Sequence, residues 1–294
     1  MDTIKNRKTA KPPWLKKSLP KGGDYQKVRN LLSRAKLHTV CQEANCPNMF
    51  ECFSKNTATF MILGSVCTRN CRFCNILQKI PIPVDNDEPM RVAKAAQDLK
   101  LKYVVITSVT RDDLEDGGAF QFANTIKAIK SEISDSVKIE VLIPDFQGNF
   151  KALKIVVDAK PDVLNHNIET VPSLYPTARP EANYQQSLEL LQNVKSLNSS
   201  IGSSMPVKSG IMLGLGETME EVEQTMTDLY NNCCDIITIG QYLQPTKGHL
   251  KVKKYYSPKE FKTVEDKASQ IGFKKIASGP FVRSSYHASD LFFD

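Results

Sequence analysis

The chain has 294 residues, of which 41% are apolar and 24% charged, the balance of an ordinary globular protein with room for one deep core or two smaller ones. No apolar run approaches the ~20 residues that span a bilayer. The opening segment "MDTIKNRKTAKPPWLKK" also lacks the apolar centre of a signal peptide. We therefore expect a cytoplasmic protein that is not a membrane protein.

The net charge of +7 is thinly spread, with lysines concentrated in the first 21 residues and in "KGHLKVKKYY". The simplest interpretation is a solvated surface. The alternative is an acidic macromolecular partner, either a protein or a nucleic acid.

Residues 1–58 lie ahead of the regular part of the chain and are expected to form an N-terminal extension. Cys41, Cys46 and Cys52 lie in this extension with the spacing C-x4-C-x5-C. In a reducing cytoplasm, clustered cysteines bind metal more often than they form disulfides. We refer to these three cysteines as the second triplet, and they predict a metal site.

Residues 59–275 alternate short β-rich runs with longer amphipathic segments, the pattern of repeated βα units and a parallel sheet. The expected strands are 59–66, 103–109, 137–143, 161–168, 206–214 and 234–240, and the expected helices are 88–100, 119–133, 149–159, 184–198 and 218–232. Six such units predict an α/β fold, a partial (β/α)6 TIM-type barrel, whose site lies at the carboxyl ends of the strands. Residues 276–294 are expected to form a C-terminal tail.

The first predicted strand leads into "CTRNCRFCN", where Cys67, Cys71 and Cys74 are spaced C-x3-C-x2-C. We call them the first triplet. A structural zinc site takes four ligands, normally as two pairs, so a lone triplet fits zinc poorly. Three thiolates can hold three irons of a [4Fe–4S] cluster and leave the fourth open. Arg69 and Arg72 are expected to offset the charge of such a cluster. A disulfide or a zinc knuckle is the alternative.

The segment "CTRNCRFC", which follows the first predicted strand and holds the first triplet, resembles the signature of the radical S-adenosylmethionine (SAM) enzymes. The resemblance implies that the methionine part of SAM chelates the open iron. It also implies reductive cleavage of SAM to give a radical that removes hydrogen from unactivated C–H bonds. Cys67, Cys71 and Cys74 are then catalytic.

The second triplet, read together with "VRSSYHA", "TSVTRDDLEDGGA", "NHNIETV", "GIMLGLGET" and "IASGP", is similar to the lipoyl synthase family over nearly the whole chain. The family's pattern implies that Cys41, Cys46 and Cys52 bind an auxiliary [4Fe–4S] cluster with a serine of the "RSSY" stretch. By position in that motif the ligand is Ser285, although spacing alone does not separate it from Ser284.

The same resemblance implies insertion of two sulfur atoms at C6 and C8 of a protein-bound octanoyl-lysine, with the auxiliary cluster as the sulfur source. It implies that the two clusters face each other across the barrel mouth. The implied partners are octanoylated carrier domains of 2-oxoacid dehydrogenase E2 subunits and the glycine cleavage H protein. A low-potential electron donor and iron–sulfur carrier proteins are also implied, but no nucleic acid and no membrane.

SAM contacts follow by motif from the same family. Thr107 and Asp113 lie at and just after the end of the second strand, while Asn167, Glu169 and Arg179 lie at and after the end of the fourth. For Glu169 and Arg179, a buried structural network is the alternative.

Several other polar residues are given structural roles. His166 alternates with its neighbours along the strand and is expected among the core or the helices. Glu217 and Thr218 are expected to cap a helix, and Cys233 and Cys234 to be structural.

Two other functions fit parts of this pattern. The first is a different radical sulfur-inserting enzyme, acting on tRNA or a biotin precursor, and a tRNA enzyme would need a nucleic-acid module that the sequence does not reveal. The second is an electron carrier with two clusters, which would require complete ligation of both and only a small protein shell.

Overall fold

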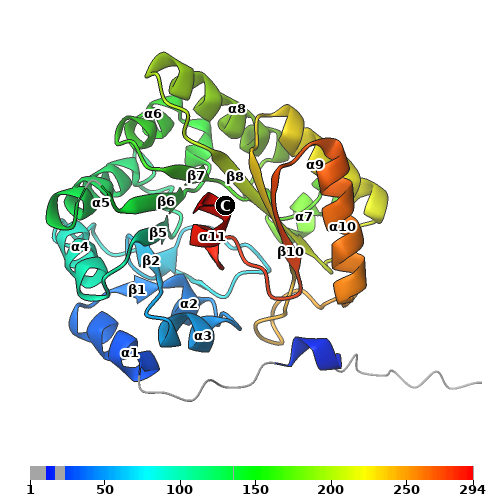
Figure 1. The fold of residues 1–294 in the computed structure, drawn as a ribbon, viewed down its shortest axis with the longest axis horizontal. Helices are drawn as coiled ribbons and strands as arrows, with labels where there is room; N and C mark the ends of the chain where they lie inside the picture. Colours follow the sequence, from blue (N-terminus) through cyan, green and yellow to red (C-terminus); the bar gives the residue numbers. More distant parts are fainter. Residues whose placement is uncertain (1–10, 17–23, 135, 294) are drawn as a thin grey trace, which may run out of the picture.

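The computed structural model describes residues 11–16, 24–134 and 136–293. Its strands are β1 (His38–Thr39), β2 (Thr59–Ile62), β3 (Val66–Cys67), β4 (Leu77–Gln78), β5 (Tyr103–Ser108), β6 (Lys138–Leu142), β7 (Val163–Asn165), β8 (Val207–Leu213), β9 (Ile236–Gln241) and β10 (Lys275–Gly279). The main sheet has the order β1-β2-β5-β6-β7-β8-β9-β10, and only the β1–β2 pairing is antiparallel. The sheet curves into a partial barrel (Figure 1).

Helices surround this sheet. They are α1 (Asp24–Arg34), α2 (Val40–Glu43), α3 (Met49–Ser54), α4 (Glu88–Asp98), α5 (Ala119–Glu132), α6 (Phe150–Asp158), α7 (Tyr175–Ala178), α8 (Tyr184–Ser200), α9 (Met219–Asn231), α10 (Pro258–Ile271) and α11 (Ala288–Phe293), with the 3-10 turns η1 (Pro13–Leu15), η2 (Phe146–Gly148) and η3 (Pro172–Leu174). Among the described residues, no helix is both long and apolar enough to cross a membrane.

The expected fold class is confirmed, and the five expected helices appear as α4, α5, α6, α8 and α9. Their apolar faces pack on the sheet, while local signals set their ends. Asn149 and Asn183 cap α6 and α8, and Thr218 forms a capping box with Glu221 at the start of α9. The Glu217 carboxylate caps the preceding turn instead, accepting the backbone N–H groups of Gly214, Leu215 and Gly216.

The sheet continues beyond the six expected strands, because β10 pairs in parallel with β9 after the unpredicted helix α10. The expected boundary between residues 275 and 276 therefore falls inside a strand. The segment "KIASG" has a single β-branched residue and ends on small ones, so it carries little strand signal. All five of its residues are only partly buried.

The chain beyond β10 enters the barrel, and α11 lies at the centre of the view in Figure 1. Two strand glycines make room for this tail. A Cβ on Gly240 would lie 2.2 Å from the carbonyl oxygen of Val282, and one on Gly210 would lie 3.1 Å from the hydroxyl oxygen of Ser284. The first is a clash with the backbone, so position 240 requires glycine, whereas the second is a tight contact with a side chain.

The tip of the tail closes the amino-end side of the barrel. The Lys275 ammonium donates to the carbonyls of Leu291 and Phe292 at the end of α11. The ring of Phe292 packs against Tyr103, the first residue of β5, with ring centroids 5.7 Å apart. Lys275 is likewise the first residue of its strand, so α11 lies against the amino ends of the strands.

Candidate active site

The first triplet lies on the loop after β2, at the carboxyl ends of the strands. Cys67 ends β3, and its Sγ accepts a hydrogen bond from the backbone N–H of Thr110, just beyond β5, at 3.3 Å. The N–H of Cys74 donates to the carbonyl of Cys71 at 2.9 Å. The ring of His249 donates to the carbonyl of Cys74 at 2.9 Å. Contacts from several loops thus fix the triplet at the expected end of the barrel.

Arg69, between the first two cysteines of this triplet, is buried and fully engaged by two carboxylates. Its guanidinium donates to Asp112 at 2.6 and 2.9 Å and to Asp145 at 2.8 and 2.7 Å. Burial raises the pKa of Asp145, but Arg69 outweighs this and holds it at about 2. The expectation that Arg69 offsets a cluster's charge is wrong, since these carboxylates already neutralise it. Arg69 instead fastens the loop to the barrel.

Three of the residues expected to contact SAM come together beside this loop. The Asn167 amide donates to the Glu169 carboxylate at 3.1 Å, and Arg179 donates to the Asn167 carbonyl at 3.1 Å. Burial raises the pKa of Glu169, partly offset by the positive charge of Arg179. Among the described residues, the buried Nε of Arg179 has no hydrogen-bond partner. Such an orphaned donor fits a polar ligand bound beside the first triplet.

Thr107 and Asp113 are engaged with other groups. The Thr107 hydroxyl donates to the carbonyl of Leu142 at 3.0 Å. The Asp113 carboxylate forms an ion pair with Arg111 at 2.8 Å, and its side chain is 38% exposed. The family resemblance also placed the neighbouring Ser108, with Thr107, where the methionine amino group of SAM binds, and its buried hydroxyl has no partner within the described part of the chain.

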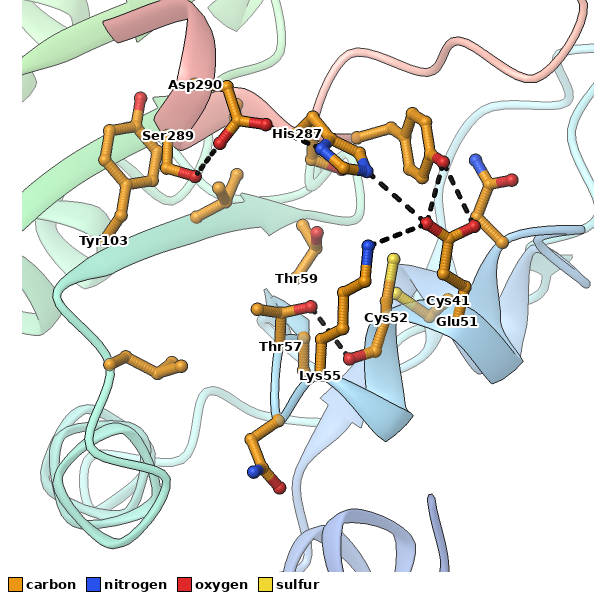
Figure 2. Close-up of a pocket in the computed structure, with 18 of the residues that line it drawn as sticks. Cys41, Glu51, Cys52, Lys55, Thr57, Thr59, Tyr103, His287, Ser289 and Asp290 are labelled. Carbon is orange, nitrogen blue, oxygen red and sulfur yellow. Dashed lines mark hydrogen bonds and ion pairs between the residues drawn. The ribbon is translucent and has the colours of Figure 1, made fainter. Parts of the chain in front are cut away.

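The second triplet lies at the opposite end of the sheet. β1 runs antiparallel to β2, with Thr39 opposite Phe60, so the chain leaves β1 toward the amino end of β2. Cys41 follows in α2, Cys46 lies in the next turn, and Cys52 lies in α3. Figure 2 shows the sulfur atoms of Cys41 and Cys52 near Thr59, the first residue of β2.

The two triplets therefore lie at opposite ends of the barrel strands. The expectation that their clusters face each other across the barrel mouth is wrong, because the antiparallel strand β1 reverses the chain before the second triplet. Sequence spacing could not reveal that reversal, since "HTV" carries no information on strand direction.

A cavity of about 920 Å³ adjoins the second triplet (Figure 2). Cys41, Cys46 and Cys52 line it together with Arg283 and Ser285 of the tail. Ser284 faces elsewhere, since its hydroxyl donates to Oδ1 of Asn167 at 2.9 Å.

The tail is also tied to the helix that carries Cys52. The Tyr286 hydroxyl donates to the Glu51 carboxylate at 3.0 and 3.1 Å, and the Asn48 amide donates to the Phe281 carbonyl at 2.7 Å. These bonds bridge more than 230 residues of sequence. They hold Ser285 beside α3.

Arg283 lies inside the barrel between the two sites. Burial lowers its pKa, and the nearby Cys46 and Glu169 oppose that shift. One side chain is thus close to a member of the second triplet and to a member of the polar group beside the first. The sequence predicted that Arg283 and Tyr286 orient the tail, with capping at the surface as the alternative.

The donor sets fit iron–sulfur clusters. All eight cysteines are free thiols, which removes the disulfide alternative. Within the described residues, no three His, Cys, Asp or Glu side chains converge on the position of a single metal ion. Burial raises the pKa of Cys41 and Cys74 to about 12, so both stay protonated until a metal replaces the proton.

Comparisons with known proteins agree with this geometry. The model of the radical SAM superfamily matches residues 61–229, and that of the N-terminal domain of lipoyl synthase matches residues 2–46. A lipoyl synthase of Caldanaerobacter subterraneus subsp. tengcongensis is 54% identical over 95% of both chains. One of Desulfotalea psychrophila is 55% identical over 97% of this chain and 94% of its own.

Solved structures share the fold at low identity. Methylornithine synthase has a TM-score of 0.54 at 15% identity, covering 86% of this chain and 74% of its own. The coproporphyrinogen III oxidase of Escherichia coli, titled a radical SAM enzyme, has a TM-score of 0.51 at 12% identity and covers 72% and 52%. These likenesses concern the barrel alone.

Proposed function

Because this chain belongs to the lipoyl synthase family of the radical SAM superfamily, we propose which of its residues carry that family's chemistry. The enzyme is a radical SAM sulfurtransferase of lipoate biosynthesis, which inserts two sulfur atoms into a protein-bound octanoyl chain. The observation that supports the proposal most is the pair of cysteine triplets at opposite ends of one barrel, with the tail running between them.

When bound, one [4Fe–4S] cluster with SAM supplies a radical that removes hydrogen, and an auxiliary [4Fe–4S] cluster supplies sulfur. Cys67, Cys71 and Cys74 would hold the first cluster. Cys41, Cys46, Cys52 and Ser285 would hold the second. Three thiols on a short loop would leave one iron of the first cluster for SAM, whereas the tail hydroxyl would supply the fourth ligand of the second.

Ser285 rather than Ser284 is proposed as the fourth ligand of the auxiliary cluster. Ser285 lines the cavity beside the second triplet, while Ser284 is bound to Asn167. An alkoxide oxygen is a harder ligand than a thiolate and suits a corner that is given up when sulfur leaves. The Glu51–Tyr286 and Asn48–Phe281 hydrogen bonds keep this serine in reach of the site.

The polar group of Asn167, Glu169 and Arg179 is proposed to bind SAM. Arg179 has an unsatisfied buried donor for an anionic group, and the Glu169 carboxylate can accept a hydrogen bond from a hydroxyl or an ammonium. Thr107 and Asp113 are kept as further contacts. For Asp113 this requires that its carboxylate contact SAM while it keeps its ion pair with Arg111.

The barrel interior would keep the reacting chain out of water. An extended octanoyl chain would run from the first site toward the second alongside the tail segment, which packs against Gly240. Arg283 inside the barrel would orient the tail between the two ends. The path proposed for the octanoyl chain thus has one cysteine triplet at each end.

The family also suggests which proteins interact with this enzyme. We propose that the octanoyl chain arrives on E2 carrier domains of 2-oxoacid dehydrogenases and on the glycine cleavage H protein. A low-potential reductant and iron–sulfur carrier proteins would support turnover. A reducing cytoplasm suits a chain whose eight cysteines are all free.

Anaerobic reconstitution of triplet variants tests these assignments. Replacing Cys67, Cys71 and Cys74 by alanine should leave about four irons and abolish SAM cleavage. Replacing Cys41, Cys46 and Cys52 should also leave about four irons but preserve SAM cleavage. Loss of SAM cleavage in the second variant, with the fold intact, would overturn the division of roles.

A further inference from the structure

Solvent-exposed apolar residues follow the first triplet along the chain. Leu77, Ile80 and Ile82 are 51%, 93% and 68% exposed, within six residues of each other. The segment is not a loose loop at its start, because β4 pairs in parallel with β3, placing Gln78 opposite Cys67. A cluster of exposed apolar side chains on an anchored segment is typical of a binding surface.

A basic segment is attached to the same cysteine loop. Residues 249 and 250 bond to it, since His249 donates to the Cys74 carbonyl and the N–H of Leu250 donates to the Arg72 carbonyl at 3.2 Å. The next residues are pinned to strand ends, with the N–H of Lys253 donating to the Gly214 carbonyl at 2.8 Å. Lys247, Lys251 and Lys253 are exposed, and none forms an ion pair with the described part of the chain.

Both segments connect the carboxyl end of a strand to the following helix. The apolar one leads from β2 to α4, and the basic one leads from β9 to α10. Such connections share one face of a parallel barrel, which here is the face of the first triplet. We call Leu77, Ile80, Ile82, Lys247, Lys251 and Lys253 the mouth surface.

We propose that the mouth surface docks the folded domain that carries the acyl chain, a partner with an acidic face and an apolar patch beside its acylated lysine. This rests on the proposed function, which brings a protein-bound chain to the barrel. The lysines would attract an acidic domain, and the apolar residues would be desolvated on contact. Their attachment to Cys67 and Cys74 places the carrier at the entrance to the first site.

Two substrates distinguish docking from chemistry. The octanoylated H protein of the glycine cleavage system needs the mouth surface, whereas a short octanoyl-lysyl peptide does not. The K247E/K251E/K253E variant should raise the Kd and the KM for the octanoylated H protein about tenfold or more at low salt, and this loss should shrink as salt is added. The I80S/I82S variant should raise the same constants without that salt dependence. Turnover of the peptide should stay unchanged in both.

A matched control changes the net charge equally elsewhere. K94E/K127E/K151E alters exposed lysines on α4, α5 and α6 and should leave the Kd for the H protein within about twofold. An equal loss in this control, or an unchanged Kd in both mouth-surface variants, overturns the docking proposal. If the unmodified enzyme leaves the peptide unconverted, the proposed function fails, yet the Kd comparison still decides the docking. All six changed mouth-surface and control lysines are exposed, and unchanged melting temperatures verify folding.

Discussion

The Ser284 hydroxyl donates a 2.9 Å hydrogen bond to Asn167, although 117 residues separate them in the chain. This bond fixes the tail inside the barrel just beyond β7. The next residue, Ser285, consequently points into the cavity of the second triplet. The two adjacent serines thus have different surroundings. Ser284 attaches the tail to the residues after β7, and Ser285 faces the proposed metal site.

Replacing Ser285 with alanine should spare SAM cleavage but block sulfur insertion, because only the second site loses a ligand. Replacing Ser284 should weaken the tail's attachment by about 1 kcal/mol, the net value of one hydrogen bond. It should therefore slow both SAM cleavage and sulfur insertion modestly. SAM cleavage and sulfur insertion are measured in parallel by mass spectrometry. If Ser284→Ala alone blocks insertion, the choice of ligand is wrong.

The tail needs Gly240 for its passage. A Cβ there would lie 2.2 Å from the carbonyl oxygen of Val282, a backbone atom that cannot turn aside. Gly240→Ala should therefore displace the tail and reduce the iron content toward about four per chain, while the first site keeps its cluster. Gly248→Ala is the control, since the nearest atom to its Cβ, Oγ1 of Thr246, would lie at an ordinary contact distance of 3.7 Å. Full iron content in Gly240→Ala would show that the tail does not need this path.

A buried ion pair braces the lumen. Lys208 and Glu140 are each 1% exposed and lie 2.9 Å apart, and the Tyr103 hydroxyl donates to the same carboxylate at 2.7 Å. Lys208→Met leaves a buried unpaired carboxylate and should destabilise the fold by about 3–5 kcal/mol. Adding Glu140→Gln to that variant should recover part of the loss. Thermal unfolding of the single and double variants measures this coupling, and strictly additive losses would contradict it.

His166 makes the fold sensitive to acid. Burial, with Arg179 nearby, lowers the pKa of its ring to about 4, from 6.5 in the unfolded chain. The unfolded state therefore takes up the proton first as the pH falls. Stability is complete above about pH 6.5 and is lost as the pH drops toward 4, by about 1 kcal/mol between pH 7.5 and 5.5. His166→Gln should flatten this slope in urea unfolding, and an unchanged slope would assign it to other groups.

The regular elements were predictable because their periodicity survives in the sequence. The runs that became β5 and β8 are short, β-rich and buried almost throughout, as strands covered on both faces are, and amphipathic helices such as α9 keep the three-and-four spacing that burial demands. The cysteine spacings marked both triplets, and "RSSY" marked the tail. His166 lies as expected between the sheet and α8, with Nδ1 donating to Ile143 and Nε2 3.1 Å from the Ser187 hydroxyl.

What escaped prediction depends on contacts between distant segments. The direction of β1 places the second triplet at the amino ends of the strands, and only its pairing with β2 decides that direction. Arg69 was predicted to offset the charge of a cluster, because the sequence does not show that Asp112 and Asp145 form ion pairs with it in the folded protein. The strand β10 is stabilised by β9 beside it rather than by its own composition.

The central claim is that this one barrel holds two clusters and uses them to convert an octanoyl chain into a lipoyl group. The most direct test is anaerobic reconstitution with iron and sulfide, followed by addition of dithionite, SAM and an octanoyl-lysyl peptide. We predict about eight irons per chain and a peptide that gains two sulfurs and loses two hydrogens. About eight irons with SAM cleavage but an unchanged peptide mass would contradict the claim, leaving a radical enzyme with another substrate.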